Sequence, residues 1–203
     1  MNYRFILVAA LALVMYACNE SRDNPANENT AQSTADSTAS DDSPYFPVTS
    51  YLKSEIAYVD SLPVGIMKYR TSGAKQDSSY IKLEEFHQLA SEFLAPELTD
   101  SMFRRSFNKT SMYDQSNSSG VFFYNTKDSA TSVKRVDVVT GKGAVYDEVK
   151  SIYIEKETIA GTNAVTKKMY WKPGRNFQII TLTPDANGKL NSEQVKVVWD
   201  NRE

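Results

Sequence analysis

Seven short β-rich runs fill the second half of the chain, and their spacing constrains the fold more than any other feature. They are Phe107–Asp114, Val121–Thr126, Ser132–Val139, Val149–Glu157, Val165–Lys172, Phe177–Thr183 and Gln194–Asp200. Turn-forming pairs such as Pro173-Gly174 and Asn187-Gly188 separate them, as in tight hairpins. A parallel connection needs a dozen or more residues, and these gaps are shorter. The sequence therefore predicts an antiparallel meander of about six to seven strands.

The part of the chain before these runs shows helical spacing instead. Apolar residues three and four apart predict a helix over 48–60, which ends before Pro63, and a second helix over 82–95 with a short helical piece after it. Between them, Val64–Thr71 alternates like a strand, and Ser72–Ser79 is interpreted as a polar loop. The fold class is therefore α+β, with two or three N-terminal helices packed on the antiparallel β-meander.

Several of the predicted strands alternate cleanly between apolar and polar residues. Met169 and Trp171, for example, alternate with Lys168 and Tyr170. Successive side chains of a strand point to opposite faces of its sheet. One face of the meander is therefore expected to be buried and the other wet, as antiparallel sheets allow.

The first residues of the chain have a different character. One positive charge at Arg4 precedes an apolar run over residues 5–17, and polar residues follow Cys18 directly. The run has the length of the apolar region of a secretory signal peptide and falls short of the roughly 20 residues that a transmembrane helix needs. The pattern around Ala17 and Cys18 resembles the lipobox of bacterial lipoproteins, including envelope lipoproteins of the Bacteroidota type. The resemblance covers only this N-terminal segment, and Met15 and Tyr16 depart from the usual lipobox residues.

The resemblance implies cleavage after Ala17 and attachment of lipid, such as palmitate, to Cys18. Cys18 is the only cysteine in the chain, and a leftover thiol is a liability in an oxidising compartment, so acylation accounts for it. The alternative is an ordinary secretory signal in which Cys18 has no special role. Asn19 stands where the better-known sorting rule often places an aspartate for inner-membrane retention. We therefore expect an outer-membrane rather than an inner-membrane anchor.

Residues 19–43 contain no large apolar side chain. Such a segment cannot offset the entropy of ordering by burial, so a disordered tether is expected. The domain organisation expected is thus a signal peptide over 1–17, a lipidated N-terminus and tether over 18–43, and a single globular domain over 44–203. Four aspartate–serine pairs resemble the short Asp-Ser/Thr-apolar signal for O-glycosylation in exported Bacteroidota proteins. The serines are Ser37 in the tether and Ser61, Ser101 and Ser129 in the domain.

Composition argues against several classes of partner and cofactor. The chain has 23 Lys and Arg residues against 25 Asp and Glu residues, a formal net charge of −2, which gives no basic footprint for nucleic acid. One histidine and one cysteine are too few for a zinc site. Asp185, Asn187 and Gly188 are too few for calcium and read better as a turn. No cofactor is expected, because Gly141-Lys142-Gly143 lacks the spacing of a phosphate-binding loop.

Two features of the sequence are candidates for catalysis. His87 is the only histidine and lies on the second predicted helix, where it could serve as a general base or pack as a boundary residue. Glu155 and Glu157 lie two apart on a predicted strand, so both face the same way; paired carboxylates can hydrolyse glycosides, but a solvated charged strand face is commoner. The sequence has no nucleophile elbow. No residue is assigned a catalytic role.

Aromatic residues on the predicted strands are the candidates for binding. Phe122, Phe123 and Tyr124 are consecutive, so Phe123 must face away from its two neighbours. If the side chains of Phe123, Tyr153 and Tyr170 point outward, they form a candidate binding surface. If they point inward, they belong to the core.

The leading hypothesis is a non-enzymatic lipoprotein of the cell envelope, tethered to a membrane by lipid on Cys18, whose domain binds a protein or an apolar ligand. The alternative is an envelope hydrolase or carbohydrate-active enzyme that uses carboxylates or His87. A structural or assembly accessory is a third hypothesis, and the sequence does not separate it from the first.

Overall fold

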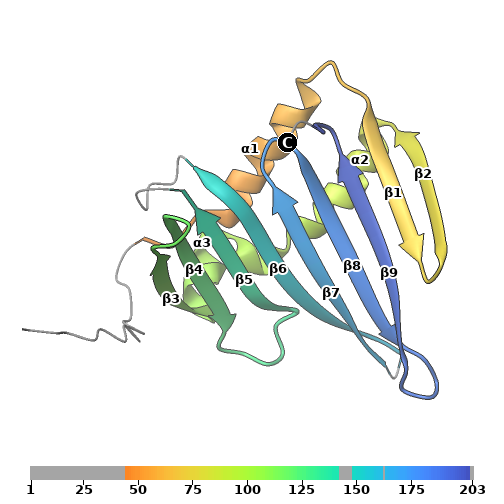
Figure 1. Ribbon diagram of the computed structural model, residues 1–203. Coiled ribbons are helices and arrows are strands. Elements are labelled where there is room, and N and C mark those ends of the chain that lie inside the picture. Colours follow the sequence, from red (N-terminus) through yellow and green to blue (C-terminus); the bar gives the residue numbers. More distant parts are fainter. Residues whose placement is uncertain (1–43, 142–147, 162, 202–203) are drawn as a thin grey trace, which may run out of the picture. The chain divides into compact units, whose positions relative to one another are not determined.

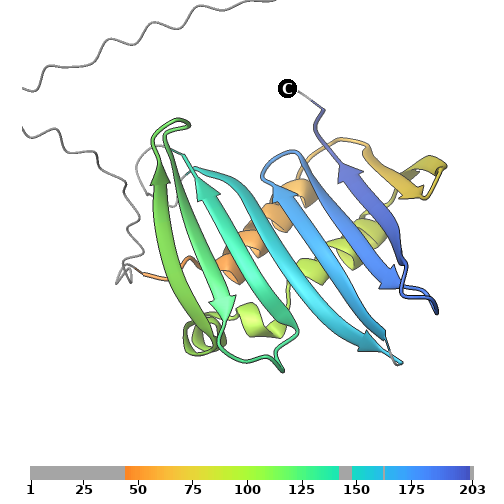
Figure 2. The ribbon, with the colours of Figure 1, turned by 60° about the horizontal axis from the view of Figure 1, so that its bottom comes forward.

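The computed structural model describes residues 44–141, 148–161 and 163–201. The chain separates into two units, Met1–Ala35 and Asp36–Glu203, and every described residue belongs to the second. Within that unit, helices lie against a single antiparallel sheet (Figures 1 and 2). The α+β class expected from the sequence is therefore confirmed.

The helices all precede the long run of strands. They are α1 (Val48–Asp60), α2 (Leu83–Ala90) and α3 (Asp100–Ser106), with two 3-10 turns between α2 and α3, η1 (Ser91–Phe93) and η2 (Pro96–Leu98). The first predicted helix is confirmed over its whole length. The second is shorter than predicted, because the chain tightens into η1 after Ala90.

The strands form one nine-stranded sheet in the order β2-β1-β9-β8-β7-β6-β5-β4-β3. Their bounds are β1 (Ile66–Ser72), β2 (Lys75–Ile81), β3 (Phe107–Asp114), β4 (Ser119–Thr126), β5 (Val133–Thr140), β6 (Val149–Ala160), β7 (Asn163–Lys172), β8 (Asn176–Pro184) and β9 (Leu190–Val198). The meander β3–β9 corresponds to the seven predicted runs, and all its pairings are antiparallel.

The predicted count of six to seven strands is wrong, since the sheet has nine. Ser72–Ser79 is not a loop: it turns at Gly73, which has a positive φ of 57°, and returns as β2. β2 is an edge strand on which almost every residue is exposed, so its sequence carries no alternation of apolar and polar residues. β1 joins the sheet through β9, with Tyr69 opposite Lys196, a pairing between distant segments that local patterns do not reveal.

The helices cover one face of the sheet (Figure 2), and the core lies between the two layers. Phe93 of η1 packs edge-on against Trp171 at 5.2 Å, and Phe86 of α2 packs edge-on against Trp199 at 5.7 Å. Burying aromatic side chains of this size supplies much of the stability of such a core. The inward side chains are those predicted from alternation, including Met169 and Trp171, both fully buried.

Candidate functional site

The opposite face of the sheet has no helix of the described chain on it (Figure 2). We call it the helix-free face. The strand pairings align its side chains in rows that run across the strands, because directly opposed residues of neighbouring strands point the same way.

One such row contains the three aromatic residues singled out in the sequence. Phe123 on β4 is paired with Asp137 on β5, Asp137 with Tyr153 on β6, and Tyr153 with Tyr170 on β7. The Tyr153 and Tyr170 rings lie 4.8 Å apart, and Tyr170 is 50% exposed. We call Phe123, Tyr153 and Tyr170 the aromatic row. Their neighbours Phe122 and Tyr124 point to the helix-covered face, where Tyr124 is fully buried.

Charged side chains hold the aromatic row in place. The Arg135 guanidinium lies 5.4 Å from the centre of the Phe123 ring, and Arg135 Nε donates to Asp137 Oδ1 at 2.7 Å. This bond raises the pKa of Arg135 further above its usual value. The Tyr153 hydroxyl donates to Glu155 Oε2 at 2.6 Å. Burial raises the pKa of Tyr153, and its hydrogen bond to Glu155 raises it further, so Tyr153 presents a neutral hydroxyl at neutral pH.

The same row continues beyond the residues that sequence reasoning found. Tyr170 is paired with Gln178 on β8, Gln178 with Lys196 on β9, and Lys196 with Tyr69 on β1. Tyr69 is 41% exposed. The sequence did not show which face Tyr69 takes, and its alignment with Tyr170 depends on the β1–β9 pairing.

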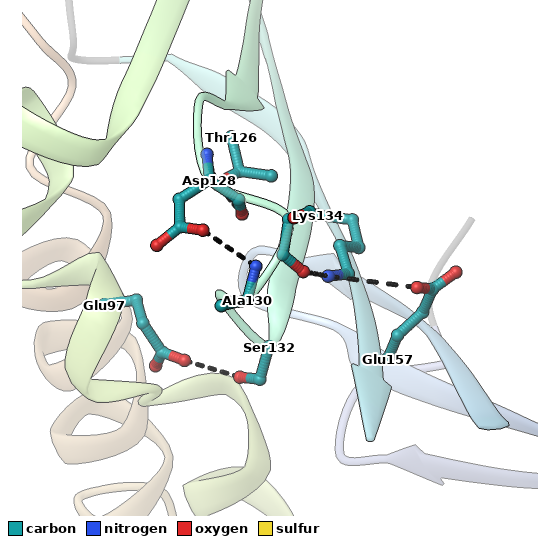
Figure 3. Close-up of polar contacts among 8 residues, drawn as sticks. Glu97, Thr126, Asp128, Ala130, Ser132, Lys134 and Glu157 are labelled. Atoms are coloured by element: carbon teal, nitrogen blue, oxygen red, sulfur yellow. Dashed lines mark hydrogen bonds and ion pairs between the residues drawn. The ribbon is translucent and has the colours of Figure 1, made fainter. Parts of the chain in front are cut away.

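Glu155 and Glu157 do face the same way, but they lie on the open face of the sheet. Glu155 accepts the Tyr153 hydroxyl, and Glu157 Oε2 lies 3.9 Å from Lys134 Nζ, as Figure 3 shows for the latter pair. Both carboxylates are thus engaged with neighbouring side chains. Neither lines the pocket described below.

His87 is paired across two helices. Its Nε2 atom lies 2.7 Å from Oδ1 of Asp60 at the end of α1, and both side chains are substantially exposed. A histidine oriented by a carboxylate supplies two parts of a hydrolytic triad. Within the described residues no hydroxyl hydrogen-bonds to the His87 ring, and the nearby hydroxyls of Ser61 and Ser91 donate to backbone carbonyls. The pair joins α1 to α2.

A pocket of about 430 Å³ opens where α1 ends and α2 begins, and Lys82 and Glu84 contribute polar groups to its wall. Val59, Leu62, Ile66, Ile81 and Leu83 supply its apolar lining, and Tyr80 also contributes to the lining. Its volume falls within the range of small-ligand sites, roughly 300–1,000 Å³. No local sequence pattern predicts this pocket, because its walls come from four separate elements.

The loop between β4 and β5 contains Ser129, one of the four serines of the glycosylation pattern. Figure 3 shows how it is fixed: Ala130 N donates to Asp128 Oδ1 at 2.8 Å, and Ser132 Oγ donates to Glu97 Oε1 at 2.5 Å. Ser129 is exposed and its carbonyl accepts Lys134 Nζ. Ser61 and Ser101 are exposed as well. Modification of these serines stays a prediction.

Several predicted features lie outside the described residues. They are the signal peptide over 1–17, the cleavage position Ala17, the lipidation position Cys18, the tether with Ser37, and most of the turn at Gly141–Gly143. Across the described part of the chain, no group of three or more His, Cys, Asp or Glu side chains is placed to hold a metal ion. No helix in that part is long and apolar enough to span a membrane.

Comparison of the chain with models of known families, with curated proteins and with solved structures gave no match.

Proposed function

We propose that the protein is a lipid-anchored, non-enzymatic binding module of the cell envelope. Cys18 carries the lipid, the following residues act as a tether, and the helix-free face receives a partner protein. The observation that carries the proposal is the aromatic row. A line of aromatic rings, half-buried at Phe123 and Tyr153 and exposed at Tyr170, adjoins the Arg135–Asp137 pair and has the residue types that are enriched in protein interfaces.

Two experiments test the two halves of the proposal. Metabolic labelling of the producing cell with a fatty-acid probe should mark the wild-type chain and leave Cys18→Ser unlabelled. Equal labelling of both chains, or none, would refute the anchor. Photo-cross-linking tests the surface: p-benzoylphenylalanine in place of Phe123 should give one discrete protein adduct, while the same residue in place of the exposed Tyr58 on α1 should give none.

The enzymatic alternative predicts catalytic turnover, whereas the proposed binding module predicts none. The purified chain should show no turnover on a broad panel of ester, peptide and glycoside substrates. Robust turnover that disappears in His87→Ala, while the unfolding temperature is unchanged, would replace the binding module by a hydrolase that uses the His87–Asp60 pair.

A second binding mode is favoured by the pocket between α1, β2 and α2. Its size and lining suit a small apolar ligand. An uncharged fluorescent probe such as N-phenylnaphthylamine should bind with enhanced emission, and Ile81→Trp should abolish the binding by filling the pocket. Unchanged binding in that variant would remove this mode.

A further inference from the structure

Charge is distributed unevenly over the helix-free face. On β7, β8, β9 and β1, the outward positions fixed by the strand pairing contain Lys168, Lys172 and Lys196, and they contain no aspartate or glutamate. On β5 and β6 the same face contains Asp137, Glu155 and Glu157 together with Arg135, and Glu155 lies opposite Lys168 in the β6–β7 pairing. The half formed by β7, β8, β9 and β1 is called the lysine face below.

The three lysines are free of the partners that other lysines of the domain have. Among the described residues, no ion pair or hydrogen bond engages their ammonium groups. On the helix-covered face, by contrast, Lys167 bonds to Glu92 at 2.8 Å, and Lys68 pairs with Glu85. The ammonium groups of Lys172 and Lys196 are therefore available to an external anion, and Lys168 has Glu155 as its cross-strand neighbour without a bond between them.

The spacing of the lysines suits an extended anionic surface rather than a single anion. Lys168 and Lys172 lie four residues apart on β7, about 13 Å at the usual rise of a strand. Tyr170 lies between Lys168 and Lys172 on β7. Lys196 lies two strands away from Tyr170 in the same row, a separation of about 10 Å. Three cations so far apart cannot converge on one phosphate, but each can meet a separate headgroup.

Tyr170 and Tyr69 lie in the same row as Lys196, and Leu190 lies at the other end of β9. Tyr170, Tyr69 and Leu190 point outward from the same strands, and Leu190 is 60% exposed. Tyrosine is enriched at the level of lipid headgroups, and lysine can extend its ammonium group into them while its stem covers apolar surface. A soluble polyanion would satisfy the lysines but leave these apolar groups in water.

We propose that the lysine face docks on the surface of a bilayer that contains anionic lipid. The inference rests on the proposed lipid anchor, which would hold the domain close to such a surface. A lysine near an anionic membrane contributes about fivefold to binding, so three contribute about a hundredfold. The aromatic row meets the lysine face at Tyr170, so a partner bound there would be held beside the membrane.

The test uses the full lipidated chain in vesicles of phosphatidylcholine alone or with phosphatidylglycerol. Because Cys18 is the only natural cysteine, one added cysteine can take a fluorophore: Gln178→Cys in the lysine face, or Ser50→Cys on the exposed side of α1 as the control. A quencher on the lipid headgroups should quench the Gln178→Cys label only in anionic vesicles and at low salt. It should leave the Ser50→Cys label unchanged.

A charge-matched pair of variants tests the position of the lysines. K168Q/K172Q/K196Q should lower the ratio of docked to undocked protein about a hundredfold. K53Q/K75Q/K82Q removes three exposed lysines elsewhere and should change the ratio less than about twofold. An equal effect of both variants, quenching that ignores lipid charge or salt, or protection of the label by soluble polyphosphate but not by vesicles would overturn the proposal. Loss of the anchor would instead appear as failure to float with neutral vesicles.

Discussion

Glu55 joins helix α1 to the sheet through a single carboxylate oxygen. Its Oε2 atom accepts the backbone N–H of Gly174 at 2.9 Å and the indole N–H of Trp171 at 3.4 Å. Trp171 is fully buried, so Glu55→Ala would leave its N–H without an acceptor. Bonds to a charged group contribute about 1.5–3 kcal/mol, and the second bond is long. We expect Glu55→Ala to lower the free energy of unfolding by about 2 kcal/mol.

Urea denaturation and thermal melting measure this loss. For a domain of this size, about 2 kcal/mol corresponds to a fall in Tm of about 4–8 °C. Glu55→Gln keeps an acceptor oxygen and loses only the charge, so it should lose about half as much. If Glu55→Ala unfolds within about 0.5 kcal/mol of wild type, the carboxylate does not hold α1 against the β7–β8 turn.

Three further predictions concern single contacts. Tyr124→Phe removes the hydroxyl that accepts the buried Phe46 N–H at 3.0 Å, and urea denaturation should show a loss of about 1–3 kcal/mol; an unchanged midpoint would contradict the contact. Gly174→Ala places a Cβ at a φ of 67°, and thermal melting should show that the free energy of unfolding falls by about 1–2 kcal/mol. Burial raises the pKa of Glu97, but hydrogen bonds, chiefly from Ser132, outweigh it and leave the pKa below its usual value. A carboxyl with a lowered folded-state pKa stabilises above its unfolded pKa, and this is lost as the pH falls through the folded value. Ser132→Ala should therefore destabilise at pH 7, with a difference from wild type that shrinks below about pH 4; a constant difference would assign the effect to packing.

The meander and the first helix could be predicted from the sequence, because each produces a local periodic pattern of apolar residues. Met169 and Trp171 alternate with polar residues on β7, and the sheet buries them as the alternation indicates. β2 could not be predicted from the sequence, because an edge strand that is exposed to solvent on both faces has no alternation of apolar and polar residues. The sequence also could not place β1 beside β9, since that pairing depends on the path of the whole chain.

The candidate site shows the same division. The sequence showed that Phe123 opposes Phe122 and Tyr124, but it could not say which side faced the core. Burial of Tyr124 decides this. The gathering of Phe123, Tyr153 and Tyr170 in one row depends on the register of four strands. Tyr69 enters that row only through the β1–β9 ladder, which no local pattern encodes.

The pairing of β1 with β9 also sets a condition on the rate of folding. The β1–β2 hairpin can form from neighbouring residues, but β9, the partner of its other edge, is the last strand along the chain. Contacts between segments so distant in sequence slow folding, and an unpaired edge can meanwhile add a strand from another molecule. Before β9 arrives, both the hairpin and the growing meander present such edges. The interval before that last pairing is therefore when the chain is most exposed to aggregation, and variants that weaken β9 should show it as lower yield before they show it as lower stability.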